Sequence, residues 1–365
     1  MLAASRSAVI LDDSTFIIAG DDGKLIKSAD TGRTWKWIET FNRNDFFDMD
    51  FLDERTGIIV GQDGIYLKTT DGGNKWSAGK IAADTLWSVH IINEKIYFTA
   101  GNKGLILKSM DSGYSWQTVH EDNGFDVKKI KFFDENTGIA VCNMGAVLRT
   151  TDGGINWKKI RQGIEGEVFK DLEFIDKSTV IAAYDSVWSY FAKTILIKED
   201  DVIDTILPFF VWKIKLIDTN RVFFLSYFGR YTITDKQFNI LKTGEINCDK
   251  FELKNDTIHE RPGLADIAAD KNGGILLTSE VFDHSIAFSD DYGESFELLH
   301  WMYSAIPPYG QRNLFNLGII NGSELIIGSS GRIFRSADGG VIWDQVFPNR
   351  YTSQDKYAFS PSNFF

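Results

Sequence analysis

The stretch Ser28-Ala29-Asp30-Thr31-Gly32-Arg33-Thr34-Trp35 decides the fold, because its pattern of Ser or Thr, then Asp, Gly and Trp, returns along the chain. We call this octapeptide the box. Three further boxes begin at residues 69, 109 and 150, so the first four are 41, 40 and 41 residues apart. Two late copies begin at residues 289 and 336. So regular a period indicates structurally equivalent units.

The chemistry of the box is that of a tight turn between two strands. Its Asp carboxylate is expected to accept hydrogen bonds from backbone N–H groups a residue or two further on. The following Gly supplies a backbone conformation that a side chain would disfavour. The aromatic residue three positions later is expected to enter a hydrophobic layer. A site repeated six times is more simply structural than catalytic, so we assign a structural role to Asp30, Asp71, Asp111, Asp152, Asp291 and Asp338.

Each box sits in the same frame of four short strands joined by an Asp-rich turn, a two-residue turn and the box itself. In the second unit the predicted strands are residues 47–51, 57–60 and 65–68, with the fourth opening at Trp76. Units five and six keep the strands but lack the box. In unit five we predict strands at 169–174, 180–183, 195–198 and 202–207, and in unit six at 211–217, 222–226, 231–234 and 238–241.

Small four-stranded antiparallel sheets repeated every 40 residues or so cannot bury both faces alone, which predicts an all-β fold, a β-propeller with box turns on one face. An open solenoid is the structural rival, and the propeller is favoured because it leaves only short, protected edges. Eight blades are favoured, or seven if units five and six do not both form complete blades. One propeller domain is expected over residues 1–347, with units at about 5–40, 44–80, 84–121, 125–161, 166–207, 209–245, 264–300 and 312–347. Residues 348–365 form a tail expected to pack at the closure of the ring.

Composition excludes several classes of function. The chain has 365 residues, 39 basic and 51 acidic, for a net charge of −12. This balance argues against nucleic acid or an anionic membrane as the main partner. No stretch reaches the apolar length of about 20 residues that spans a bilayer. We expect no membrane span, and we expect a monomer.

The sequence carries no visible export signal, so a cytoplasmic location is expected, with a mature secreted or periplasmic form as the alternative. The two cysteines, Cys142 and Cys248, fall in different repeats without metal-ligand spacing. Cys142 occupies a position held by Gly20 and Gly61 in other units, which favours a small packed residue over a reactive thiol. No metal or cofactor is predicted.

The box as quoted resembles the Asp-box, or bacterial neuraminidase repeat, and the longer frame resembles photosystem II assembly-factor-like propellers. The resemblance is carried by Gly64-Ile-Tyr-Leu-Lys-Thr-Thr-Asp-Gly-Gly73 and Gly331-Arg-Ile-Phe-Arg-Ser-Ala-Asp-Gly-Gly340, and it covers units one to four, seven and eight. It implies the sialidase-superfamily fold. It does not imply one activity, because Asp-boxes occur in sialidases, xyloglucanases, sortilin-type receptors and assembly factors.

The sialidase activity implied by one branch of this resemblance is not expected here. Those enzymes carry an Arg-Ile-Pro motif near the N-terminus, and the early arginines of this chain, Arg6, Arg33, Arg43 and Arg55, are not in such a motif. Xyloglucanase-like enzymes use two propellers across a cleft, whereas this chain is long enough for one. Assembly-factor-like propellers carry protein partners, and that interpretation requires no missing residues.

The loops on the face opposite the boxes are the predicted location of function. Units one to four have minimal turns there, whereas long loops are predicted at residues 184–194, 245–263, 280–285 and 300–313. Aromatic, carboxylate and arginine side chains in these loops suit a carbohydrate or peptide. The ligand-binding candidates are Tyr184, Trp188, Tyr190, His259, Arg261, His284, Trp301, Tyr303, Tyr309 and Arg312.

Two functions follow from this loop surface. The favoured one is a non-enzymatic scaffold that binds a protein or glycan. The alternative is a glycoside hydrolase whose acid and base are two of Asp185, Glu280 and Asp283, which would need to lie roughly 5–9.5 Å apart. The structural alternative for any single aromatic residue is that it packs over neighbouring blades.

Five lysines on predicted innermost strands offer another feature. Either they are solvated, or they bind an anionic ligand or an acidic segment in the channel. They are Lys128, Lys129, Lys170, Lys213 and Lys215.

Overall fold

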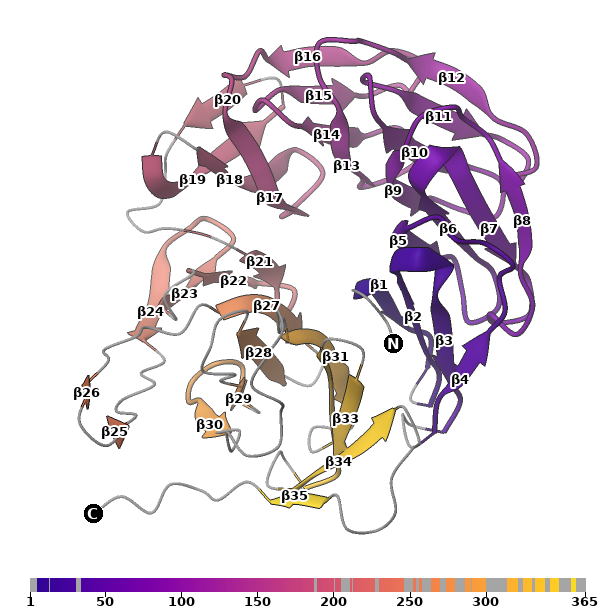
Figure 1. Cartoon of the computed structure of the whole chain (residues 1–365). Coiled ribbons are helices and arrows are strands. Elements are labelled where there is room, and N and C mark those ends of the chain that lie inside the picture. Colours follow the sequence, from indigo (N-terminus) through magenta and orange to yellow (C-terminus); the bar gives the residue numbers. More distant parts are fainter. Residues whose placement is uncertain are drawn as a thin grey trace. The chain divides into compact units, whose positions relative to one another are not determined.

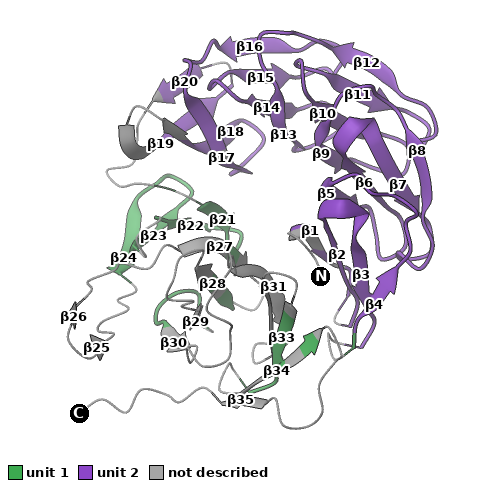
Figure 2. Ribbon diagram, viewed as in Figure 1, with its two compact units in different colours: residues 1, 32–34, 209–365 green, residues 2–31, 35–208 purple. Residues whose placement is uncertain are grey.

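The computed structural model describes residues 5–12, 14–30, 34–186, 189–199, 201–204, 211, 213–226, 230–245, 252–253, 256–257, 264–269, 274–279, 286–289, 291–299, 314–320, 324–329, 332–338, 342–347 and 356–358. Contacts divide the chain into two compact units, one of residues 2–31 and 35–208 and one of residues 1, 32–34 and 209–365 (Figure 2). Each unit is described by itself below. Among the described residues, no helix is long and apolar enough to cross a membrane.

The unit of residues 2–208 contains five four-stranded antiparallel sheets in chain order (Figure 1). The first two are β1 (Ser5–Ile10), β2 (Phe16–Gly20), β3 (Leu25–Ser28), β4 (Lys36–Ile38) and β5 (Phe46–Phe51), β6 (Gly57–Gly61), β7 (Ile65–Thr69), β8 (Ser77–Lys80). The third and fourth are β9 (Leu86–Ile91), β10 (Tyr97–Gly101), β11 (Ile106–Ser109), β12 (Gln117–His120) and β13 (Val127–Phe132), β14 (Gly138–Cys142), β15 (Val147–Thr150), β16 (Lys158–Arg161). The fifth is β17 (Glu167–Phe174), β18 (Thr179–Ser186), β19 (Ser189–Lys198), β20 (Asp201–Asp204).

The unit of residues 209–365 contains two further four-stranded sheets and one of five strands. They are β21 (Lys213–Leu216), β22 (Arg221–Leu225), β23 (Arg230–Asp235), β24 (Ile240–Glu245); β27 (Leu264–Ala269), β28 (Ile275–Ser279), β29 (Ile286–Ser289), β30 (Glu297–Leu299); and β31 (Leu314–Ile320), β32 (Glu324–Ser329), β33 (Arg332–Ser336), β34 (Ile342–Phe347), β35 (Lys356–Ala358). A separate pair, β25 (Glu252–Leu253) and β26 (Asp256–Thr257), lies within the predicted loop 245–263.

The described sheets of four or more strands number eight, in agreement with the eight units predicted from the strand pattern. Units five and six both form complete sheets. One predicted loop is wrong: residues 184–194 mostly belong to β18 and β19, whose pairing reaches Ser186 with Ser189. This segment has no Gly or Pro and is rich in aromatic residues, which favours extension of the hairpin over a loop.

Hydrophobic clusters form between successive sheets, because the central strands are apolar on both faces. Ile17 and Leu25 of the first sheet pack with Phe46 and Ile59 of the second. Equivalent clusters lie between the second and third, third and fourth, and fourth and fifth sheets, and between the β21–β24 and β27–β30 sheets. Sheet-on-sheet burial of this kind supplies most of the favourable free energy of the fold.

The second box shows how the turn is built. The Thr69 hydroxyl donates to the Asp71 carboxylate at 2.9 Å and accepts the buried Gly73 N–H, also at 2.9 Å. Asp71 accepts the backbone N–H groups of Asn74 at 3.0 Å and Lys75 at 2.9 Å. The expected donors were a residue or two away, and the observed ones are three and four away. The Thr69 hydroxyl therefore accepts the hydrogen bond from Gly73, and the Asp71 carboxylate accepts those from Asn74 and Lys75.

The box aromatic residue enters the layer between sheets, as predicted. Trp76, Trp116 and Trp157 each pack against the cluster between their own sheet and the preceding one. The Trp76 indole N–H also donates to the Gly73 carbonyl at 3.1 Å, so its polar atom is satisfied. Phe296 packs in the same way in the other unit.

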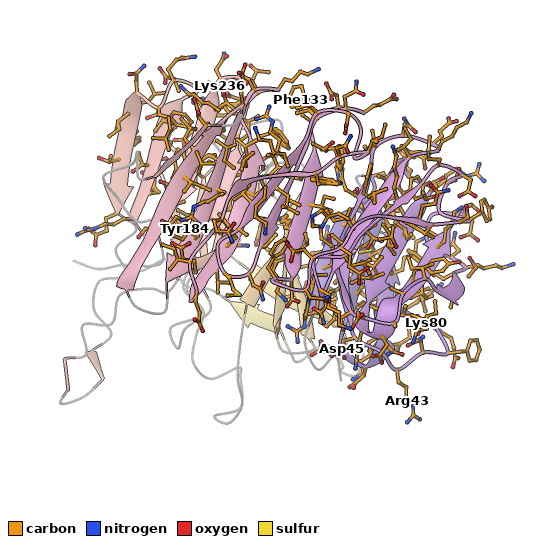
Figure 3. All side chains as sticks on the ribbon, turned by 90° about the horizontal axis from the view of Figure 1, so that it is seen from above. Arg43, Asp45, Lys80, Phe133, Tyr184 and Lys236 are labelled. Atoms are coloured by element: carbon orange, nitrogen blue, oxygen red, sulfur yellow. The ribbon has the colours of Figure 1, made fainter. Side chains whose placement is uncertain are left out.

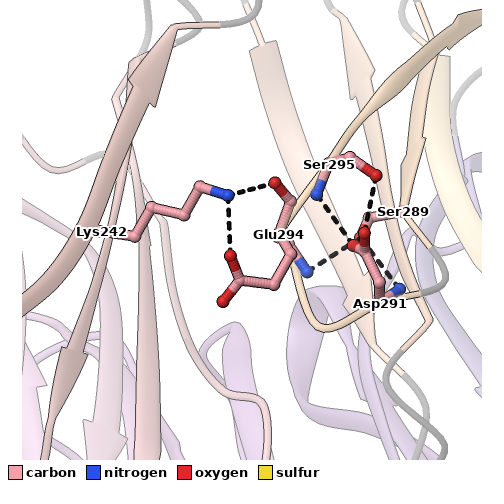
Figure 4. Close-up of polar contacts among 6 residues, drawn as sticks. Lys242, Ser289, Asp291, Glu294 and Ser295 are labelled. Atoms are coloured by element: carbon pink, nitrogen blue, oxygen red, sulfur yellow. Dashed lines mark hydrogen bonds and ion pairs between the residues drawn. The ribbon is translucent and has the colours of Figure 1, made fainter.

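Cations on neighbouring sheets anchor the box turns. Lys27 donates to the Gly72 carbonyl at 2.7 Å, and Lys108 donates to the Gly153 carbonyl at 2.6 Å. Lys68 makes the equivalent bond to the Ser112 carbonyl, and Arg149 bonds the Glu199 carbonyl in the turn that stands in place of the box in unit five. Figure 4 shows the corresponding contact in the other unit, where Lys242 reaches the carbonyl and carboxylate of Glu294 beside Asp291. The carbonyl groups of these box turns therefore join adjacent sheets, which supports the structural role predicted for the boxes.

Candidate functional site

The unit of residues 2–208 has two faces of different construction. The box face includes the turn at Phe133, and the opposite face includes Arg43 and Asp45, as Figure 3 shows. The turns between β2 and β3 and between β6 and β7, Asp21–Gly23 and Gln62–Gly64, lie next to the segments that enter the following sheets. We call this second surface the turn face.

The turn face is rigid because the tight turns of the second, third and fourth sheets are hydrogen-bonded to the segments that enter the first strands of their own sheets. Gln62 N–H donates to the Asp45 carbonyl at 2.8 Å, and Asn102 N–H donates to the Thr85 carbonyl at 3.0 Å. Gly64 has a φ of +71°, and a Cβ there would lie 2.1 Å from the Ala82 carbonyl oxygen. These positions tolerate neither a side chain nor a large movement of the connecting segment.

A β-bulge occurs at the same place in the first strand of each of the first four sheets. The register shifts around Arg6 in β1, Phe47 in β5, Trp87 in β9 and Lys128 in β13, so each of these residues is the extra, unpaired one. Bulges change the direction of side chains and are common beside functional sites. The first strands lie along the inner side of this unit (Figure 1), so the four bulges come together there.

The four bulge residues form one continuous stack. The Arg6 guanidinium lies 5.8 Å from the centre of the Phe47 ring, and the Phe47 and Trp87 rings are 4.4 Å apart. The Lys128 ammonium lies 3.9 Å from the centre of the Trp87 ring. The order is cation, aromatic, aromatic, cation. Cation–π attraction and ring contact of this kind fix all four side chains relative to one another.

Polar contacts hold the stack at the turn face. Arg6 pairs with Asp21 at 2.8 Å, and the Trp87 indole N–H donates to the Asn102 side chain at 2.6 Å. Lys128 pairs with Asp126 at 3.2 Å. Asp21 and Asn102 belong to the tight turns, so the rigid turn face positions the stack.

The stack is more exposed than the core beside it. Phe46 and Leu86, which precede the two aromatic residues, are fully buried in the clusters between sheets. Phe47 and Trp87 are only partly buried, and the Arg6 side chain is 46% exposed. Two large aromatic side chains kept partly in water, on a rigid support and between two cations, are typical of a binding surface rather than of core packing.

The carboxylates that follow the bulge in β5 satisfy the edge of β9. Asp48 accepts the Ser88 hydroxyl at 2.9 Å and the Val89 N–H at 3.0 Å, and Asp50 accepts the Ile91 N–H at 2.7 Å. Burial raises the pKa of Asp48, opposed by these hydrogen bonds and by Lys129. These groups therefore join two sheets beneath the stack, and we give them no catalytic role.

The predicted channel lysines lie on first strands, as expected, and those of β13 are paired. Lys128 contacts Trp87 and Asp126, and Lys129 lies 3.7 Å from Asp171. Each is therefore paired with a carboxylate rather than simply solvated. Lys213 and Lys215 lie in β21, and Lys170 is the bulge residue of β17.

Most of the predicted ligand-binding residues fall outside the described part of the chain. Tyr184 is the candidate whose side chain is described, and it is 2% exposed, with its ring 5.8 Å from Phe169 and the Arg161 guanidinium 5.0 Å from its centre. It is therefore a packing residue, not an exposed stacking surface. Asp185 belongs to β18 and Tyr190 to β19. Outside the described residues lie Trp188, His259, Arg261, Glu280, Asp283, His284, Trp301, Tyr303, Tyr309 and Arg312.

The stack itself was missed by the sequence analysis, although the sequence holds a signal for it. Arg6, Phe47, Trp87 and Lys128 are 41, 40 and 41 residues apart, the same intervals as the boxes. Residues at equivalent positions in consecutive sheets lie side by side, so this period alone predicts a row of neighbours.

Comparisons with known proteins agree with this architecture. A family described as "Photosynthesis system II assembly factor YCF48" matches residues 33–191. No curated protein matches the chain. A solved structure titled "YCF48 bound to D1 peptide" is similar with a TM-score of 0.53 at 18% identity, covering 81% of this chain and 91% of that one.

Two other solved propellers are similar in fold. The C-terminal WD40 domain of Sif2 has a TM-score of 0.62 at 11% identity and covers 92% of this chain and 97% of its own. AFV00434, described as an ancestral GH74 enzyme, has a TM-score of 0.59 at 16% identity; 96% of this chain aligns with 55% of that enzyme. The chain is thus an all-β propeller that resembles the photosystem II assembly factor, as its boxes predict.

Proposed function

We propose that this protein is a non-enzymatic scaffold that binds a segment of a partner protein at the turn face, centred on the stack of Arg6, Phe47, Trp87 and Lys128. The observation that carries the proposal is the Phe47–Trp87 ring pair, 4.4 Å apart and partly exposed between two cations. Aromatic and arginine side chains at the centre of a surface supply much of the free energy of protein association.

The rigid support strengthens this interpretation. The bulges, the tight turns and the bonds to Asn102 and Asp21 already hold the side chains in place before any partner arrives. Less conformational entropy is then lost on binding, which favours affinity. The similar YCF48 structure is described as bound to a D1 peptide, so a propeller of this kind accommodates a peptide in that protein.

A protein segment is favoured over a glycan by the way the rings are covered. Sugar stacking uses an open aromatic face. The Trp87 ring contacts Phe47 on the strand at one side and Lys128 on the strand at the other. The Phe47 ring also contacts Arg6. The parts of these rings that stay exposed suit apolar side chains of a polypeptide.

The hydrolase alternative depends on side chains that lie outside the described residues. Its candidate acid and base, two of Asp185, Glu280 and Asp283, are the residues for which a separation of roughly 5–9.5 Å would be required. We retain the predicted loops 245–263, 280–285 and 300–313 as a separate proposed binding surface of the unit of residues 209–365, which shortening of residues 280–285 would test.

A quantitative affinity capture tests the proposed function. Immobilised wild-type protein is compared with Trp87→Ala and with Trp37→Ala, a matched control because Trp37 is 49% exposed on β4. We expect at least one protein to be retained by the wild type and by Trp37→Ala and lost with Trp87→Ala. Equal capture by all three folded variants would contradict the proposal.

A further inference from the structure

We infer that the partner segment is extended and carries two acidic side chains separated by about three apolar residues. This inference rests on the proposed function and adds the chemistry of the partner. Its basis is the order and spacing of the stack, in which a cation stands at each end and two aromatic rings stand between them.

The length of the stack sets the spacing. The three separations of 5.8, 4.4 and 3.9 Å, taken end to end, place the Arg6 and Lys128 charges at most about 14 Å apart. An extended chain advances about 3.3 Å per residue. Two acidic residues four positions apart therefore span this distance on one face of the segment, and the side chain midway between them, which points the same way, covers the rings.

The charges at the two ends are available for exchange. Arg6 pairs with Asp21 and Lys128 with Asp126, and the cations remain 46% and 30% exposed. Surface ion pairs of this kind contribute little to stability, so a ligand carboxylate can replace Asp21 or Asp126 at small cost. The aromatic rings hold both cations in position while their partners change.

The charge of the chain adds selectivity. With a net charge of −12, the protein repels acidic polypeptides in general. Only a segment whose carboxylates meet Arg6 and Lys128 gains compensating contacts. Both spacing and charge are therefore required, and a uniformly acidic segment is disfavoured.

The central rings favour apolar residues between the acids. Trp87 donates its indole N–H to Asn102, which leaves the ring pair without a free donor for a polar ligand side chain. Leucine or valine above Phe47 and Trp87 removes their exposed edges from water, at about 25 cal/mol per Å² of apolar surface.

Synthetic peptides test this directly. Fluorescein-labelled nonapeptides carry two glutamates separated by three leucines, the same glutamates separated by one leucine, or glutamine at both positions. Binding is measured by fluorescence anisotropy. We expect the three-leucine glutamate peptide to bind at least about tenfold more tightly than the other two, as charge-assisted contacts require.

Charge exchange provides the control for specificity. Lys128→Glu is expected to lose the preference for the two-glutamate peptide and to prefer a peptide with lysine at one of the two positions. The melting temperature of the variant reports whether it folds. Lys36→Glu, at an exposed residue of β4 outside the turn face and the stack, is expected to keep the wild-type preference.

The outcomes separate the inference from the proposed function. Equal affinities for glutamate and glutamine peptides, or no binding of any peptide, overturn the acidic spacing. If the Trp87-dependent capture persists in either case, the proposed function stands. If capture does not depend on Trp87, both the proposed function and the inference about the partner segment are wrong.

Discussion

Replacement of Thr69 by valine exchanges one box hydroxyl for a methyl group and leaves the rest of the side chain in place. Thr69 is 2% exposed, and its hydroxyl accepts the buried Gly73 N–H at 2.9 Å while donating to Asp71 at 2.9 Å. Valine fills the same space but offers no acceptor. The Gly73 N–H then remains buried without a partner, which costs about 1–3 kcal/mol.

The neighbouring Thr70 is the matched control, because it is exposed at the second position of the same box. Thr70→Val should change the free energy of unfolding by no more than about 0.5 kcal/mol. Thr69→Ser keeps the hydroxyl and should restore most of the loss. Urea denaturation followed by tryptophan fluorescence measures all three. Equal stabilities of Thr69→Val and Thr70→Val would refute the structural account of the box.

Three further predictions concern other features. Gly64→Ala places a Cβ 2.1 Å from the Ala82 carbonyl oxygen at a φ of +71°, so it should destabilise the fold by more than about 2 kcal/mol in urea, whereas Gly124→Ala should not. The Ser115 side chain and N–H, with Ser109, lower the pKa of Asp111 to about 2; its contribution to stability is present above the unfolded pKa and is lost as the pH falls from about 4 to about 2. Asp111→Asn should therefore flatten the dependence of melting temperature on pH in that window, and an unchanged slope would contradict the assignment. Burial raises the pKa of the Cys142 thiol, so iodoacetamide should label it only after unfolding, as mass spectrometry of its peptide would show.

The sequence predicts the fold because the residue types of the box determine the geometry of its turn. A hydroxyl, a carboxylate, a glycine and an aromatic residue at fixed offsets specify one turn, and their regular spacing specifies the repeat. Strands in the units without the box were also located correctly, since the strands predicted at residues 169–174 and 222–226 match β17 and β22. Boundaries moved by a few residues, mainly where hairpins continued, as between β18 and β19.

The candidate site was harder to predict because bulges break the alternation on which strand prediction depends. Phe47 reads as the first apolar residue of the strand 47–51, whose inward side chains would be 47, 49 and 51. In the structure Phe46 is the buried residue and Phe47 is unpaired, because the bulge shifts the register between them and Asp48. A one-residue shift reverses the facing of side chains, so local pattern alone cannot locate Phe47 in the stack.

The sequence places function in long loops and predicts only minimal connections at the short turns of units one to four. Their importance comes from contacts across sheets, such as Trp87 with Asn102 and Arg6 with Asp21. Pairings of this kind join residues 15 positions apart through the bulge geometry, which a single sequence does not display. The equal spacing of the four stack residues is the only trace of them.

Hydrogen–deuterium exchange of the protein with a captured partner tests the central claim, that the turn face binds and the box face is structural. The account predicts slower exchange on binding in peptides covering residues 44–51, 84–91 and 101–104. It predicts no change in box peptides covering residues 69–76 and 109–116. Protection confined to the boxes, with residues 44–51 and 84–91 unaffected, would contradict it.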